Sequence, residues 1–77
     1  MKPKHEQQLE RVVAMLTDAM GILDDVRHAV EPSYERRSDK YKQSDEGENM
    51  GYNIEDMSNA VGDINCAIDK LNDVINR

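Results

Sequence analysis

The sequence predicts an all-α protein, in which an antiparallel hairpin of two long helices with a partly ordered or short-helical connector oligomerises into a helical bundle. Three observations predict this class. Apolar residues recur at steps of three and four in two long segments, which is the spacing of one helix face. A polar stretch with a proline separates the two segments. The chain has 77 residues, so residues 1–77 are expected to form one domain with a thin core.

The first helix is expected over about residues 5–30. Its main apolar stripe is interrupted once, at Arg27, and consists of Leu9, Val13, Leu16, Met20, Leu23 and Val30. A second stripe lies beside it and consists of Val12, Met15, Ala19, Ile22, Val26 and Ala29. The two stripes together cover roughly 200° of the helix, which is more than one partner helix covers. Pro32 is predicted to end the helix, because the residue before a proline is disfavoured in helical geometry.

The connector is expected over residues 31–43, which is longer than an ordinary helix–helix turn. It interleaves aromatic and basic side chains, and these form a candidate nucleotide-binding set of Tyr34, Arg36, Arg37, Lys40 and Tyr41. A tyrosine ring stacks on a nucleobase, and a guanidinium group pairs with a phosphate. The alternative is a short solvated helix that begins at Pro32, with Tyr34 or Tyr41 folded over the end of the bundle.

The second helix is expected over about residues 45–76. Its apolar stripe repeats at four- and three-residue steps without a break and consists of Met50, Ile54, Met57, Val61, Ile64, Ile68, Leu71 and Ile75. Ser44 followed by acidic residues is typical of a helix start, because the hydroxyl caps free N–H groups and the helix dipole favours acids there. Gly47 and Gly51 weaken the first two turns by roughly 1 kcal/mol each relative to Ala. A later start at Asn53 is therefore the competing interpretation.

Two helices have no third layer to complete a core, so a single hairpin leaves much of the wide arc on the first helix in water. Self-association into a dimer or a larger assembly is predicted to cover this arc. The predicted interface between copies consists of Val12, Met15, Ala19, Ile22, Val26, Met50, Ile54, Met57, Val61, Ile64, Ile68, Leu71 and Ile75. The competing interpretation is a monomer that keeps the second stripe for a foreign partner.

Charge is unevenly distributed along the chain. The net charge is −6, and residues 44–77 carry eight acidic side chains against only Lys70 and Arg77. This balance argues against nucleic acid as a direct partner, because phosphate binding needs a basic surface. The acidic half instead offers a candidate surface for a basic region of another protein, which consists of Glu55, Asp56, Asp63, Asp69 and Asp73.

Several classes of function and location are not expected from the sequence. No apolar run reaches the roughly 18 residues of a membrane span, and the N-terminal residues lack the apolar core of a secretory signal. The single cysteine, Cys66, suits the reducing cytoplasm. Asp25 and His28 share one helical face, but a metal site needs further ligands, so an ion pair of His28 with Asp24 or Asp25 is expected. The sequence holds no phosphate-binding loop and no catalytic triad, so we expect no enzyme, no metal and no cofactor.

A resemblance comes from the run between Arg37 and Glu48, which reads Arg-Ser-Asp-Lys-Tyr-Lys-Gln-Ser-Asp-Glu-Gly-Glu and precedes heptads rich in Asp, Asn, Ala and Ile. Over about residues 34–76 this pattern resembles a group of small helical-hairpin proteins that bacteriophages and prophages encode. The chain departs from that pattern at Gly51 and Gly62, and it has Asn where those proteins mostly have Glu. The resemblance implies a mobile-element origin and a location in the cytoplasm of a host cell. It transfers no catalytic residue.

These observations lead to three hypotheses of function. The first is a small non-catalytic phage or mobile-element accessory protein that binds and inhibits a host factor, such as a bacterial anti-phage defence component, in the manner of an anti-CRISPR protein. The second is an oligomeric sponge that sequesters a cyclic nucleotide immune signal through the connector. The third is a self-associating structural hairpin that binds only itself.

Overall fold

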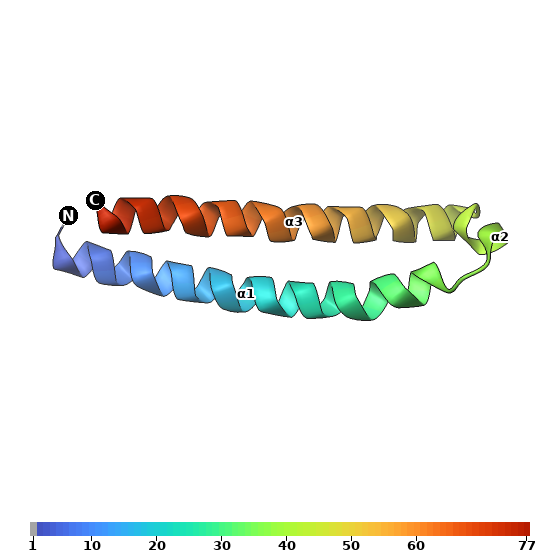
Figure 1. Ribbon diagram of the computed structural model, residues 1–77, viewed down its shortest axis with the longest axis horizontal. Coiled ribbons are helices and arrows are strands. Elements are labelled where there is room, and N and C mark those ends of the chain that lie inside the picture. The colour runs from blue at the N-terminus through green and yellow to red at the C-terminus, as the bar shows by residue number, and fades with distance from the viewer. Residues whose placement is uncertain (1) are drawn as a thin grey trace.

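The computed structural model describes residues 2–77 and contains three helices. These are α1 (Pro3–Glu35), α2 (Asp39–Lys42) and α3 (Asp45–Asn76). None of the residues from 2 to 77 lies in a strand, so the prediction of an all-α fold is confirmed. The long helices α1 and α3 lie side by side and run in opposite directions, and α2 lies at the turn between them (Figure 1). The resulting rod measures 57 × 15 × 14 Å.

The end of α1 differs from the prediction, because the helix runs through Pro32 to Glu35 instead of ending at about residue 30. Proline has no N–H group, so the carbonyl of His28 loses its helical donor at this point. The loss is tolerated because Pro32 and His28 are both exposed, which leaves that carbonyl accessible to water. Beyond the proline, the N–H of Arg36 donates to the carbonyl of Pro32 at 3.2 Å. The ribbon of α1 bends back toward α3 over these last turns (Figure 1), as helices do at a proline.

The predicted connector over residues 31–43 is correspondingly shorter, since α1 takes its first residues and α2 takes Asp39–Lys42. Two serines with extended backbones precede the helices in this region, Ser38 before α2 and Ser44 before α3. The hydroxyl of Ser38 accepts from the N–H of Tyr41 at 3.2 Å, and the hydroxyl of Ser44 accepts from the N–H of Gly47 at 3.1 Å. Each serine thus satisfies an N–H group that has no partner inside its helix.

Gly47 has a structural role that the sequence analysis did not foresee. A Cβ atom built at this position would lie only 1.9 Å from the carbonyl oxygen of Tyr41 and 2.8 Å from the Cα of Lys42. Gly47 is buried in the first turn of α3, where the backbone of α2 passes directly over it. The absence of a side chain therefore lets α2 pack against the start of α3.

The contact between α1 and α3 is a narrow apolar seam. The eight stripe residues of α3 are half-buried or buried, and so are the six main-stripe residues of α1. Ile54 and Ile68, each 8% exposed, are the only apolar side chains in the described part of the chain that count as buried. No side chain between residues 2 and 77 is less than 2% exposed. The pair of helices therefore has a half-covered seam in place of a closed core.

Candidate functional site

One polar contact in the seam shows which sides of α1 and α3 lie together. Arg27 occupies a seam position of α1, where its guanidinium lies 2.6 Å from the carboxylate of Asp24 and donates to the hydroxyl of Ser58 on α3 at 3.3 Å. With the seam residues written as a and d of a heptad, Asp24 and Ser58 both occupy e positions. In an antiparallel pair the e positions of both helices lie on one side of the seam and the g positions on the other. Arg27, Asp24 and Ser58 therefore mark a polar side.

The opposite side of the seam is apolar and is the first candidate surface. The g positions are Val12, Ala19 and Val26 on α1 and Ala60, Ala67 and Val74 on α3. The adjoining c positions of α1 are Met15, Ile22 and Ala29. We call these nine residues the apolar face. Its three residues on α3 are half-buried, whereas its six on α1 are exposed, with Met15 at 59% and Ile22 at 68%.

The structure therefore divides the predicted interface between copies into two parts. The five residues on α1 (Val12, Met15, Ala19, Ile22 and Val26) are all exposed and available to a further molecule. The eight residues on α3, from Met50 to Ile75, lie along the seam and contact α1 of the same chain. The α3 stripe of a single chain is thus occupied by contacts with its own α1. A second molecule would therefore contact the five exposed residues of α1 and the g positions of α3.

The acidic residues of α3 form the second candidate surface. Glu55, Asp56, Asp63, Asp69 and Asp73 are all exposed at b, c and f positions, which point away from α1. None of them takes part in an ion pair with another residue of the described chain. Their carboxylates are therefore solvated and accessible along most of the length of the helix.

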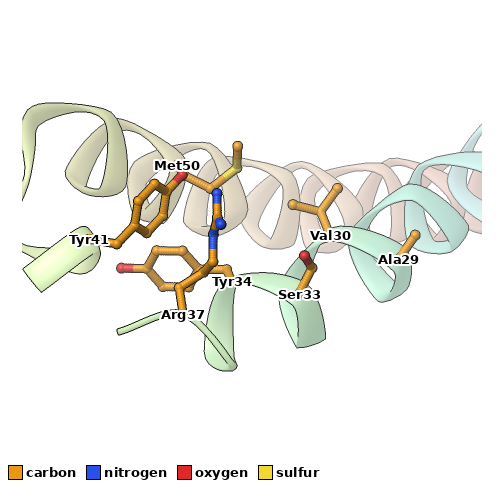
Figure 2. A pocket seen from close by; sticks show the side chains of 7 residues that line it. All are labelled: Ala29, Val30, Ser33, Tyr34, Arg37, Tyr41 and Met50. Atoms are coloured by element: carbon orange, nitrogen blue, oxygen red, sulfur yellow. The ribbon is translucent and has the colours of Figure 1, made fainter. Parts of the chain in front are cut away.

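The third candidate surface is a pocket of about 290 Å³ near the turn, between the end of α1, α2 and the start of α3. Tyr34, Arg37 and Tyr41 gather at one end of the pocket, and Ala29, Val30 and Ser33 lie toward the other end (Figure 2). Three members of the predicted nucleotide-binding set are therefore brought together. The other two, Arg36 and Lys40, are exposed and do not line the pocket.

The cations of this region already contact the aromatic rings. The guanidinium carbon of Arg37 lies 4.2 Å from the centre of the Tyr41 ring, and the ammonium nitrogen of Lys42 lies 5.5 Å from the centre of the Tyr34 ring. The same ammonium donates to the backbone carbonyl of Glu35 at 3.2 Å. Lys42 is not a member of the predicted nucleotide-binding set, because its contacts require α1 to continue past Pro32. A stacking ligand would displace or share these cation–π contacts, which are worth about 0.5–1 kcal/mol when exposed.

Searches against protein-family models, curated proteins and solved structures gave no match to this chain. The function is therefore inferred from the apolar face, the acidic residues of α3 and the pocket near the turn.

Of the remaining reactive side chains, His28 lies apart from these surfaces and Cys66 lies among the acidic residues of α3. His28 pairs with Asp24, whose carboxylate oxygen lies 3.5 Å from Nδ1 of the imidazole, and Asp25 is exposed next to it. Cys66 is exposed on α3 at an f position. Within residues 2–77 no three His, Cys, Asp or Glu side chains converge as metal ligands do. None of the helices described combines the length and the apolar content that crossing a membrane requires.

Proposed function

We propose that this chain is a non-catalytic binding protein, a two-helix antiparallel hairpin that self-associates through its apolar face into a helical bundle and binds a basic protein through the acidic residues of α3. The observation that carries this proposal is the exposure of the apolar face on a chain whose described residues form no closed core. Ile22 is 68% exposed and Met15 is 59% exposed. Fully burying a side chain of this size stabilises an assembly by roughly 1.5–3 kcal/mol.

The acidic residues support a second contact on another part of the surface. Glu55, Asp69 and Asp73 occupy b and f positions and point away from the apolar face, so they stay in water when that face is covered. Exposed charges of one sign accelerate encounter with a surface of the opposite sign and contribute less to final affinity. The partner that fits this surface is a protein with a basic patch.

We propose further that binding inhibits the partner, and that the partner is a host protein such as a component of a bacterial anti-phage defence system. This part of the proposal rests on the resemblance of residues 34–76 to phage-encoded hairpins. Inhibition by occupancy needs only a surface that competes with the natural ligand of the partner, so it is consistent with a chain that acts through its helix faces.

An affinity capture experiment tests the contact with a partner. Immobilised wild-type protein is expected to retain one stoichiometric protein from a bacterial lysate at low salt and to release it at high salt. Glu55→Lys/Asp69→Lys/Asp73→Lys is expected to lose that protein. Glu10→Lys/Glu31→Lys/Glu35→Lys on α1 makes the same change in net charge and is expected to keep it. Retention by both variants, or loss by both, would contradict a role for this surface.

The pocket near the turn favours a second candidate function, the sequestration of a cyclic nucleotide. Tyr34, Arg37 and Tyr41 line that pocket, and two rings with one guanidinium suit a base and a phosphate. Calorimetric titration with cyclic dinucleotides and trinucleotides is expected to show binding that Arg37→Ala/Tyr41→Ala abolishes and Arg36→Ala/Lys40→Ala keeps. The absence of heat with every nucleotide would exclude this candidate. If the lysate experiment recovers only the chain itself, the structural hairpin is the remaining function.

A further inference from the structure

We propose that the apolar face is covered by a second copy of this chain in one specific orientation, with the two α1 helices antiparallel and a twofold axis passing through the layer that contains Ala19 and Ala67. This inference rests on the proposed self-association and specifies its geometry.

The register of α1 against α3 defines the layers of the face. Arg27 bonds to Ser58, and the hydroxyl of Tyr34 lies 3.2 Å from the point where a Cβ of Gly51 would be. Both contacts are seven residues apart on each helix, so they belong to a single register. Continued along the helices, this register places Val26 level with Ala60, Ala19 with Ala67, and Val12 with Val74.

The resulting pattern of side-chain sizes is symmetric about its middle layer on α1, whereas on α3 the smaller Ala60 and the larger Val74 lie on either side of Ala67. The central layer contains two alanines, and the outer layers contain the three valines and Ala60. A twofold axis at the central layer places Val12 opposite Val26 of the second copy, and Met15 opposite Ile22. Small side chains at the centre let the helices approach closely there, while larger ones fill the space on either side.

The charged residues that border the apolar face are also arranged along its length. On α3 the c positions next to the face are, in order, Asp56, Asp63, Lys70 and Arg77. On α1 the f positions next to the face are, in order, Lys4, Arg11, Asp18 and Asp25. Because α1 and α3 are antiparallel, the basic members of both rows lie toward the termini and the acidic members toward α2. The face therefore has a basic end and an acidic end.

The proposed orientation brings the basic end of one copy against the acidic end of the other. Across the twofold axis, Asp63 meets Lys70 and Asp56 meets Arg77, and each pair occurs twice. On the α1 border Arg11 meets Asp25, also twice, whereas Asp18 near the axis meets its own copy, which is unfavourable. Opposite charges at the edge of an interface set its orientation while apolar burial supplies most of the affinity.

The other way of stacking the two faces turns the second copy about the long axis, so that α1 lies on α3. That arrangement puts both basic ends together and both acidic ends together. Arg11 would lie level with the stretch between Lys70 and Arg77, and Asp25 with the stretch between Asp56 and Asp63. Like charges in contact are unfavourable, so the charge rows select the first orientation.

The broad side of the molecule that carries the apolar face is large enough for a pair of copies. It measures 57 by 15 Å, or about 850 Å². A stable protein–protein interface takes about 800 Å² from each partner. A second copy therefore has to cover the charged residues that border the apolar face as well as the face itself.

Sedimentation of charge variants tests the orientation. Asp63→Lys and Lys70→Asp each place like charges together twice, so each variant is expected to dimerise about tenfold more weakly than the wild type. In an equimolar mixture every introduced charge meets an opposite one, so the mixture is expected to regain wild-type dimerisation. Glu48→Lys makes the same charge change as Asp63→Lys at an outward-facing b position and is expected to dimerise like the wild type.

Cys66 provides an independent readout in the wild-type protein. It lies level with the proposed axis, so the two copies of Cys66 come onto one side of the bundle, and a short bis-maleimide is expected to join them. In the other orientation they lie on diagonally opposite helices and do not cross-link. Failure of the mixture to recover, or absence of the cross-link in a wild-type dimer, would overturn the orientation alone. A wild-type chain that stays monomeric at every concentration would overturn the proposed self-association as well.

Discussion

At the scale of single residues, the tightest constraint in the molecule is Gly47. Composition marks it as a helix-weakening residue, but in the fold the backbone carbonyl of Tyr41 occupies the space that a side chain would take. The other three glycines differ. A Cβ at Gly21 or Gly62 would meet nothing within 4 Å, and one at Gly51 would meet only the end of the flexible Tyr34 side chain. Only Gly47 joins two elements by its lack of a side chain.

Substitution of Gly47 tests this constraint. Gly47→Ala is expected to lower the free energy of unfolding by about 1–3 kcal/mol, because the backbone of α2 must move away from the first turn of α3. Gly62→Ala lies on an open stretch of the same helix and is expected to raise it by up to about 1 kcal/mol through helix propensity. Urea unfolding of both variants gives the comparison. Equal stabilities for the two variants would show that the close approach carries no cost.

At the scale of elements, the interactions that decide a helix boundary differ in their range along the chain. Ser44 caps the N–H of Gly47 three residues later. The start of α3 is therefore determined by residues close together in the chain and can be predicted from the sequence. The end of α1 depends on distant contacts. Tyr34 packs over Gly51 and Lys42 reaches back to Glu35, and these contacts support the helical turn beyond Pro32. A rule about the residue before proline contains no such information, so it placed the end too early.

The same difference applies to the candidate surfaces. The width of the apolar arc on α1 follows from helical periodicity, so its exposure on a two-helix fold was predictable. The side of α3 that adjoins it was not, because the direction in which two helices are placed together depends on cross-helix contacts such as that of Arg27 with Ser58. The pocket near the turn depends likewise on α1 extending to Glu35. The kinds of residue that line the pocket were therefore predictable from the sequence, but the individual lining residues were not.

The role of Arg27 in the seam is testable at this scale. Its side chain is 26% exposed and its partner Asp24 is 35% exposed, so the ion pair contributes at most about 1 kcal/mol. Arg27→Met is therefore expected to leave the free energy of unfolding within about 1 kcal/mol of the wild type or to raise it, because an unbranched apolar side chain completes the seam. Urea unfolding measures this change, with Asp24→Asn as the matched control that removes the opposite charge beside the guanidinium and lowers stability. A loss above about 2 kcal/mol in Arg27→Met would show that the polar contact itself holds the helices together.

At the scale of the whole molecule, the rod has too few layers to bury its own apolar residues. Among the apolar residues described, only Ile54 and Ile68 are buried. Four others are more than 40% exposed, namely Val12, Met15, Ile22 and Val26. In the proposed bundle these four side chains become the second half of a core whose first half is the seam.

Ile22→Glu tests this view of the molecule. A carboxylate at the centre of the covered face is expected to shift the protein to monomer in sedimentation, because its desolvation opposes association. The isolated hairpin keeps its seam, so its helical circular dichroism at high concentration is expected to fall by little. Thr17→Glu places the same charge on the polar side of α1, and we expect its association to match the wild type. Unchanged association of Ile22→Glu would place the contact between copies elsewhere.

The positions of Pro3 and Arg77 at one end of the rod, with α2 at the far end, have a mechanical consequence (Figure 1). Tension applied through these two residues acts across the rod, so it separates α1 from α3 one pair of side chains at a time, starting at the termini. Resistance to such a pull at each step is that of the single pair of side chains at the point of separation, whereas the strength of the full seam counts only when the helices are pulled lengthwise past each other. If the protein is attached through Pro3 and Arg77, its helices would separate gradually under load and pack together again from the turn once the load is removed.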